Sequence, residues 1–338
     1  MPDRGHWWNG VLSSSDVQRA IDESGKRADP ALADRMYMVT TVVPSEMGHV
    51  HGIKILSVDV PGRIARVEID LSEGENISLT THNTARIIVN LNHYKSLPLR
   101  SLIVNGKRWY PEVFDSLVAS IRGDAVEFHY WQDTDQLERT SGRLLSPVSL
   151  FLSAPAIILA VLPLTRATTP ARYEAFKSVA KRWAHDLLIY TTLTVRIVRA
   201  EDFDSDQLTR GSYVVFMGGY NEHRRRSAIS MIEHFPGTDE DSVREFSVHG
   251  QVFGDVGTAV LYSIPHPKNA NIDKAMVISG TDIEGIERAG RLLPVRTGLA
   301  IPEWIVVGQD ADRFGAGGVI GAGWYNNDWD WSPEMSYL

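Results

Sequence analysis

Polar residues lie at the ends of two apolar segments that have the composition of buried β-strands. At the end of SYVVFMGG and directly after it come Gly218, Gly219, Tyr220, Asn221 and Glu222, and Asp282 ends the segment KAMVISGTD. Ligands of open α/β sheets bind beyond the carboxyl ends of the strands, so we predict that these residues bind a ligand. Glu222 and His223 could act as an acid–base pair, although adjacent side chains usually diverge. The alternative, which the pattern favours, is an ordinary strand-to-helix turn with a polar helix cap.

Sequence motifs for several common catalytic and binding sites are absent. The chain contains no G-x-S-x-G, no H-E-x-x-H and no Walker A loop. Asp202, Asp204 and Asp206 have the start of a calcium-loop spacing, but Gln207 and Tyr213 replace the required Gly and Glu. The glycine-rich segment GAGGVIGAG at 315–323 lacks the dinucleotide-binding spacing and indicates tight backbone packing or a turn. We expect no cofactor.

Histidines and aromatics give two weaker candidates. His49 and His51 would lie on one face of a strand, as metal ligands can, but no third ligand is suggested by spacing, so we expect no metal site. Trp324, Trp329 and Trp331 cluster near Leu338 and could stack on a carbohydrate. The alternative, which we favour, is that these aromatics seal an interface between domains.

The elements that must position these residues change character along the chain. A short helix is expected after Ser13–Ser15, with an apolar stripe at Val17, Ala20 and Ile21. Residues 34–145 show short segments of period two and predict an antiparallel β-sandwich-like domain. Within it, Asn105-Gly106 predicts a type I′ hairpin turn.

Residues 146–338 alternate apolar strands with helical segments. The expected strands are 156–161, 194–200, 212–219, 257–265, 274–282 and 303–308, and the expected helices are 170–190, a short one within 221–235, and 282–293. This order predicts an α/β domain with three layers and a mostly parallel sheet, flavodoxin-like or Rossmann-like. The fold class is therefore α+β multidomain.

Composition restricts the partners. The formal net charge of −8 argues against a surface for nucleic acid or anionic lipid. The most apolar stretch, 151–165, is too short for a membrane span and is broken by Pro155 and Pro163. Because the chain has no cysteine, disulfides and thiolate chemistry are excluded, whereas the compartment is not fixed. The first 12 residues lack the features of a signal peptide.

A family resemblance adds a specific expectation. The opening GHWWNGVL, followed by a helix, resembles the catalytic-histidine loop and last helix of prolyl-oligopeptidase-type α/β-hydrolases, the serine peptidase and esterase family S9. Segments such as VVFMGGYNEH and IPEWIVVGQDADRFGAGGVIGAGWYNNDWDW resemble a C-terminal extension found in some secreted members. The resemblance implies that residues 1–33 are a remnant of the hydrolase domain and that His6 is the last member of a catalytic triad.

The same resemblance implies a function. The Ser and Asp of the triad precede the histidine in that family and are absent from this chain, so His6 alone retains no covalent mechanism. We therefore expect a secreted, non-catalytic accessory or binding module whose partner is a hydrolase catalytic domain, a carbohydrate, or a second copy of the chain. In a secreted protein the sequon at Asn76 could carry a glycan. The alternative is a hydrolase with its site at the strand ends or completed by another chain.

Overall fold

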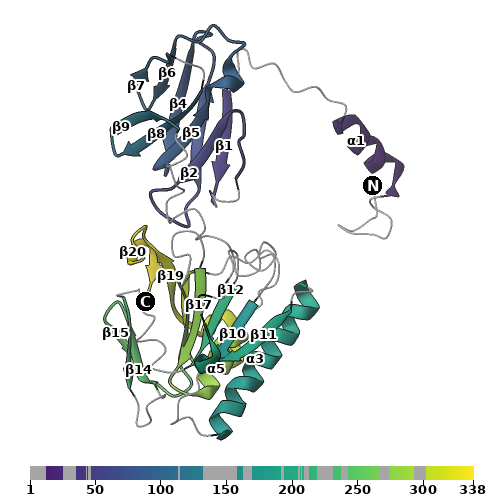
Figure 1. Ribbon diagram of the computed structural model, residues 1–338, viewed down its shortest axis with the longest axis vertical. Helices are drawn as coiled ribbons and strands as arrows, with labels where there is room; N and C mark the ends of the chain where they lie inside the picture. The colour runs from purple at the N-terminus through teal and green to yellow at the C-terminus, as the bar shows by residue number, and fades with distance from the viewer. Residues whose placement is uncertain are drawn as a thin grey trace.

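The computed structural model shows a chain organised as two lobes and a separate N-terminal helix (Figure 1). The structure describes residues 13–25, 36–42, 44, 47–112, 115–131, 158–162, 170–191, 194–204, 206, 208, 213–218, 231–236, 243–266, 274–292 and 302–338. We call residues 36–131 the N-terminal lobe and residues 158–338 the C-terminal lobe. The domain boundary that we predict at 145/146 lies outside the described residues.

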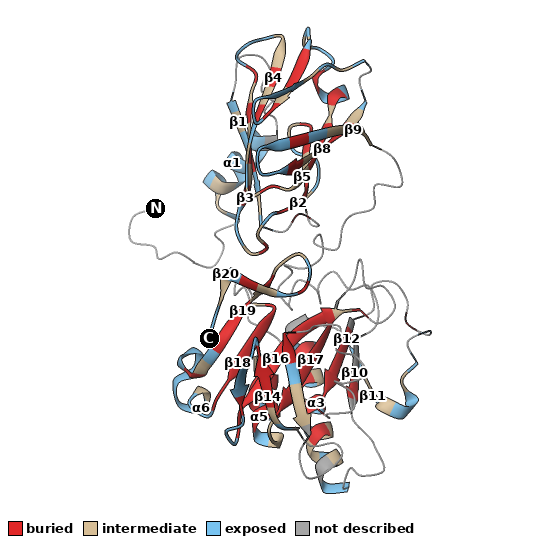
Figure 2. Ribbon diagram, turned by 90° about the vertical axis from the view of Figure 1, so that its left-hand side faces the viewer, coloured by how far each residue is buried: buried red, intermediate tan, exposed pale blue. Residues whose placement is uncertain are grey.

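Helix α1 (Ser15–Gly25) begins where the serine cluster predicts it. Its first turn carries Asp16, which pairs with Arg19 at 2.8 Å between Oδ1 and Nη2. None of its side chains described from Ser15 to Ser24 is buried, so the predicted apolar stripe, which includes Ile21, stays accessible (Figure 2).

The N-terminal lobe consists of two sheets that enclose one core. The first has the order β1-β3-β4-β6-β7 and the second the order β2-β5-β8-β9. The first sheet contains β1 (Met36–Thr41), β3 (Ala65–Asp70), β4 (Asn76–His82), β6 (Ser101–Val104) and β7 (Lys107–Trp109). The second contains β2 (Ile53–Ser57), β5 (Arg86–Asn90), β8 (Ser116–Arg122) and β9 (Ala125–Tyr130), and the 3₁₀ helix η3 (Leu91–Tyr94) follows β5.

Alternation along the strands explains this core. Ala65, Val67 and Ile69 of β3 are buried while the residues between them are half-buried, as expected for strands with one face inward. The Asn105-Gly106 turn is confirmed as type I′, because both residues have positive φ, 47° and 80°. The sheets are not wholly antiparallel, since β4 and β6 pair in parallel.

The C-terminal lobe contains an eight-stranded sheet of order β11-β10-β12-β17-β16-β18-β19-β20. Its strands are β10 (Ile158–Leu162), β11 (Val195–Arg199), β12 (Tyr213–Met217), β16 (Ala259–Pro265), β17 (Lys274–Gly280), β18 (Trp304–Val307), β19 (Val319–Tyr325) and β20 (Trp331–Tyr337). A second, three-stranded sheet contains β13 (Ile232–Pro236), β14 (Val243–Val248) and β15 (Gln251–Phe253).

Helices cover one face of the large sheet and the small sheet covers the other. Helices α3 (Pro170–Thr191) and α5 (Ile283–Gly290) share a core with one face, in which Trp183 is fully buried. Phe246 and Val248 of β14 pack in a second core with the opposite face, and Figure 1 shows α3 and β14 on opposite sides. The described residues of this lobe also form the short helices η5 (Ala200–Asp202), α6 (Ala311–Phe314) and η7 (Gly315–Gly318).

This arrangement corrects the predicted fold class. We predict a mostly parallel sheet between two helical layers, but only three neighbouring pairs are parallel and four are antiparallel. A sheet rather than a helical layer covers the second face, so the flavodoxin-like and Rossmann-like assignments are wrong. Similarly, residues 232–236 form β13 where we predict the end of a short helix. Continuous apolar strands are typical of parallel sheets because both faces are buried, but β16 has the same pattern and pairs antiparallel.

Candidate functional site

Two of the predicted ligand-binding residues lie at one edge of the large sheet. Gly218 follows β12 and has φ 90°, and its amide donates to the carbonyl of Ile278 in β17 at 2.8 Å. Asp282 follows β17, which pairs in parallel with β12, so both residues lie at the carboxyl ends of neighbouring strands. Residues 219–222 and His6 lie outside the described residues.

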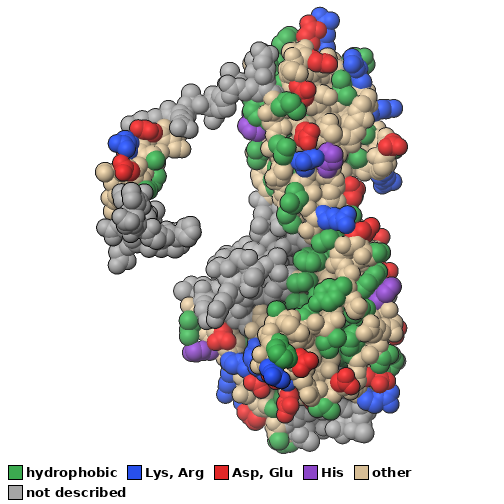
Figure 3. Space-filling view, turned by 180° about the vertical axis from the view of Figure 1, so that it is seen from behind, with side chains coloured by type: hydrophobic (Ala, Val, Ile, Leu, Met, Phe, Trp, Pro, Cys, Tyr) green, Lys and Arg blue, Asp and Glu red, His purple; other side chains and the backbone are tan. Residues whose placement is uncertain are grey.

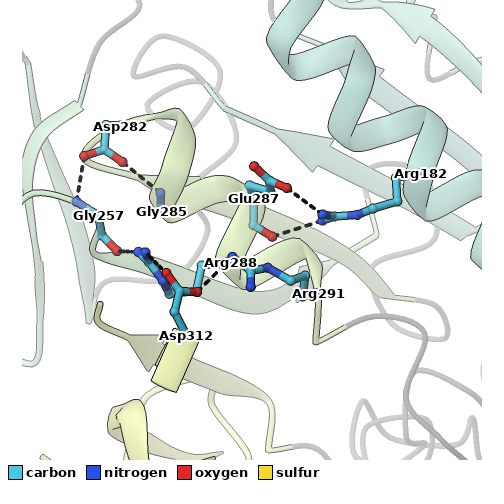
Figure 4. A network of polar contacts seen from close by, with 8 residues as sticks. All are labelled: Arg182, Gly257, Asp282, Gly285, Glu287, Arg288, Arg291 and Asp312. Atoms are coloured by element: carbon cyan, nitrogen blue, oxygen red, sulfur yellow. Dashed lines mark hydrogen bonds and ion pairs between the residues drawn. The ribbon is translucent and has the colours of Figure 1, made fainter. Parts of the chain in front are cut away.

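Asp282 accepts hydrogen bonds from two backbone amides (Figure 4). Its Oδ1 accepts from the amide of Gly285 at 2.8 Å, which makes Asp282 the N-cap of α5. Its Oδ2 accepts from the amide of Gly257 at 2.6 Å. Gly257 has φ 74°, a conformation that glycine adopts without strain. One carboxylate therefore caps the helix and ties it to the segment that leads into β16.

Thr281 strengthens the same connection. Its Oγ1 hydroxyl lies 3.0 Å from the carbonyl oxygen of Asp255 and 3.2 Å from that of Thr258, and it can donate to either. Its backbone amide donates to the carbonyl oxygen of Thr258 at 2.9 Å. The end of β17 and the start of β16 are thus held together by side-chain and backbone bonds.

Arg288 of α5 lies close to these strand ends and is a buried cation, with 6% of its surface exposed. Its Nη1 donates to the carbonyl of Gly257, and its Nη2 donates to Oδ2 of Asp312 in α6 at 2.5 Å. The hydrogen bond with Asp312 raises the pKa of Arg288 and lowers the pKa of Asp312 from its ordinary value of 3.8. Arg291 binds the second oxygen of Asp312 at 2.9 Å.

A further ion pair fixes the opposite side of α5. Nη1 of Arg182 in α3 lies 2.7 Å from Oε1 of Glu287, and its Nη2 donates to the backbone carbonyl of Glu287 at 3.1 Å. Figure 4 shows these contacts on the side of α5 away from Asp312. Helix α5 is therefore held from α3, from α6 and from the loop before β16.

A cavity of about 610 Å³ opens beside this network. It lies between the start of β16, the end of β18 and the glycine-rich turn before β19. Its lining residues are Asp255, Val256, Thr258, Gly308, Gln309, Asp310, Gly317, Gly318, Val319 and Ile320. The volume is within the range of small-molecule sites.

The side chains that line the cavity offer hydrogen-bond acceptors to a ligand. Asp255 and Asp310 supply carboxylates, and the buried Gly318 packs so closely that a side chain there would collide with the backbone of Ala311. Among the described lining residues there is no Ser, His, Lys or Tyr, so the only side-chain hydroxyl is that of Thr258. The arrangement can hold a ligand that donates hydrogen bonds, and it lacks a nucleophile with an adjacent base.

The three C-terminal tryptophans take part in packing. Trp329 is 2% exposed and lies 5.5 Å from Tyr325 between ring centroids. The ring of Trp331 stacks on that of His249 at 4.4 Å with an interplanar angle of 7°. Trp324 is half-buried and lies near Gly62 of the N-terminal lobe. The contacts of Trp329 and Trp331 lie within the C-terminal lobe, whereas that of Trp324 lies between the lobes, and a carbohydrate-stacking role stays a prediction.

Asn76 is the first residue of β4 and has two side-chain partners. Its Nδ2 donates to Oε2 of Glu73 at 2.9 Å, and its Oδ1 accepts from the fully buried Ser101 hydroxyl at 2.7 Å. A glycan would take one of the two Nδ2 hydrogens, and glycosylation of Asn76 stays a prediction.

Histidine placement gives no metal centre within the described part of the chain. No group of three or more His, Asp or Glu residues is arranged there to hold an ion. His51 packs against Tyr37 with 4.3 Å between ring centroids. Burial, with a smaller effect from Lys54, lowers the pKa of His49.

Arg288 and Gly257 are the important site residues that our sequence prediction misses. Arg288, Ile286 and Ala289 of α5 are all buried, although Arg288 lies two residues after Ile286 and therefore points to a different side of the helix. A charged residue among buried helix positions is a signal for a paired ion. The burial of Arg288 is seen only in the structure, and its partner Asp312, 24 residues later in the chain, likewise requires the fold.

Glycine at position 285 is required by close packing, and this gives a testable prediction. A Cβ there would lie 2.6 Å from the carbonyl oxygen of Thr258. We expect Gly285→Ala to lower the free energy of unfolding by about 1–3 kcal/mol, because α5 must move away from β16. Urea unfolding measures this change. In the control Gly290→Ala the new Cβ meets the side chain of Val179 at 3.2 Å, and a loss as large as that of Gly285→Ala would contradict the argument.

The pKa shift of Asp312 predicts an acid dependence of stability. Its pKa is lower in the folded chain than in the unfolded chain, so its stabilising contribution is present above pH 3.8 and disappears as the pH falls through the lowered value. We expect Asp312→Asn to lose stability at neutral pH and to have a flatter stability profile below about pH 4. Thermal unfolding from about pH 2 to 7 measures this, and parallel profiles would contradict it.

Side chains of both signs are interspersed on the face seen in Figure 3, over both lobes. Within the described residues, no helix has the length and apolar character needed to cross a membrane.

Comparison with known proteins gives one distant relative. The chain is 22% identical over 340 residues to a protein of Arthroderma benhamiae named "Uncharacterized secreted protein". The alignment covers 97% of this chain and 35% of that protein, so the chain spans about a third of the relative's length. No family model matches the chain. The relation to family S9 stays a prediction, because that name assigns no activity.

Proposed function

We propose that this chain is a non-catalytic accessory and binding module of a secreted protein. The proposal rests on the hydrogen bonds by which the polar groups near the strand ends hold the fold together. Both oxygens of Asp282 accept from backbone amides, and the guanidinium of Arg288 binds Gly257 and Asp312. Groups held in this way position α5, and each oxygen of Asp282 is already engaged by a backbone amide.

The cavity supports the binding part of the proposal. It is concave, it presents carboxylates to solvent, and its described lining residues provide no nucleophile with a base. Its ligand would donate hydrogen bonds to Asp255 and Asp310.

The secreted relative supports the accessory part. The matching region is about a third of that protein, which leaves room for further domains in the relative. Together with the resemblance of the GHWW segment to a hydrolase histidine loop, this suggests a serine hydrolase catalytic domain as the partner. Secretion of this chain is part of the proposal.

An ester-hydrolysis assay tests the alternative hypothesis, in which the residues at the strand ends form an active site. We expect the purified chain to hydrolyse chromogenic acyl esters at the buffer rate, and we expect Glu222→Gln to give the same rate. Glu222 is the acid–base candidate of the alternative hydrolase hypothesis. Saturable hydrolysis by the unsubstituted chain, lost in Glu222→Gln, would contradict the proposal and place an active site after β12.

A further inference from the structure

We propose that the two lobes are locked into one rigid body by a specific contact between loop 58–63 of the N-terminal lobe and the β19–β20 hairpin of the C-terminal lobe. We call this contact the interlobe joint, and it consists of Val58, Asp59, Gly62, Trp324, Asn327 and Met335. Figures 1 and 2 both show the β19–β20 hairpin directed toward the N-terminal lobe. The joint is an interaction surface whose partner belongs to the same chain.

Asn327 makes the polar part of the joint. Its Nδ2 donates to the carbonyl of Val58 at 3.0 Å and lies 3.4 Å from the carbonyl of Asp59. These two carbonyls are consecutive in the chain, so one amide group recognises a short length of backbone. Such recognition depends on the position of the loop and is independent of its side chains.

Gly62 makes the apolar part of the joint. A Cβ at this position would lie 2.6 Å from Cε of Met335 and 3.3 Å from Cδ2 of Trp324. Gly62 also has φ 91°, which favours glycine at this turn. The missing side chain lets the hairpin approach the loop closely.

The loop side of the joint is held in shape by hydrogen bonds within its own lobe. Oδ1 of Asn83 accepts from the amide of Val60 at 2.7 Å, and its Nδ2 donates to the carbonyls of Val60 and Arg63, each at 3.1 Å. Asn83 itself has φ 49°, a conformation that asparagine tolerates better than most residues. Three hydrogen bonds from one side chain therefore fix the loop.

The hairpin side is held in the same way. Oδ1 of Asn326 accepts from the amides of Asp328 and Asp330 at 2.9 and 3.0 Å. The amide of Asn326 donates to the carbonyl of Asp330 at 2.8 Å, and Trp329 is buried within the turn. Two pre-organised loops lose little conformational freedom when they meet.

Both sides are also anchored in the cores of their lobes. Val58 follows β2 directly and is 1% exposed within the N-terminal core. Tyr325, two residues before Asn327, is fully buried in the C-terminal core. A contact between segments fixed in this manner transmits the orientation of one core to the other. Domains within a chain move relative to one another by default, so a rigid pair is a specific claim.

The absence of cysteine allows a direct test on the full chain. We would introduce cysteines at Asp124, in the β8–β9 turn, and at Gln251, at the start of β15, and attach nitroxide labels. Both residues are exposed, and each belongs to a different lobe. Pulsed electron resonance then gives the distribution of distances between the lobes. We expect one narrow peak, and we expect Asn327→Ala to widen it by about twofold or more as interdomain motion appears.

Two further variants separate the joint from general instability. Met335→Glu removes the apolar contact with Gly62 while leaving loop 58–63 unchanged, and we expect it to widen the distribution as Asn327→Ala does. Asp328→Ala lies in the same turn and makes no hydrogen bond or ion pair with the N-terminal lobe in the described residues, so its peak should stay narrow. A broad distribution in the unsubstituted chain, or a narrow peak in both joint variants, would overturn the proposal.

Discussion

Arg288→Ala should lower the free energy of unfolding by about 3 kcal/mol, because two charge-assisted hydrogen bonds and a buried aliphatic stem are lost together. The carbonyl of Gly257 would lose its side-chain donor and Asp312 would lose its closest cation. Urea unfolding followed by tryptophan fluorescence measures the change, since the fully buried Trp183 packs in the same core.

Arg291→Ala is the matched control for this prediction. Arg291 also binds Asp312, but its side chain is 49% exposed, and exposed ion pairs contribute about 1 kcal/mol or less. Equal losses in the two variants would mean that the shared partner Asp312, rather than the burial of Arg288, determines stability.

Asp282→Ala should cost about 2–3 kcal/mol of unfolding free energy, the sum of a lost helix cap and an amide left without an acceptor. The loss should be local at first, because the capped helix and the β16 segment separate. Hydrogen exchange at the amides of Gly257 and Gly285 is the measurement, and both should exchange faster than in the unsubstituted chain.

Glu284→Ala controls for charge at the start of α5. Glu284 lies in the first turn and is exposed, so its removal should cost only a few tenths of a kcal/mol. If Asp282→Ala left both amides as protected as before, the helix cap would not depend on Asp282. The prediction that Asp282 binds a ligand would then regain support.

Local signals in the sequence predict local structure here. Asn105-Gly106 predicts its turn because two consecutive positive φ values suit those residues. Helix α3 begins at Pro170 as expected, since proline is favoured in the first helical turn. The glycine-rich segment 315–323 is confirmed as turn and close packing, in η7 and β19.

Strand direction could be predicted only in part. Residues 266–273 alone separate β16 from β17, fewer than the dozen or so that a parallel crossover requires, so their antiparallel pairing was available from the sequence. The parallel pairing of β4 with β6 could not be predicted from the sequence, because it depends on which strands meet in space. The same limit applies to the site, where Asp282 is visible as a cap but its bond to Gly257 spans 25 residues.

Covalent labelling with a fluorescent phosphonate, read by intact mass, tests the central claim most directly. We predict no adduct on the folded chain at a probe concentration that labels a known serine hydrolase completely. The reason is that the polar groups near the strand ends make hydrogen bonds that hold the fold together. A single adduct that forms on the folded chain and not on the heat-unfolded chain would contradict the account. Peptide mapping would then identify the nucleophile.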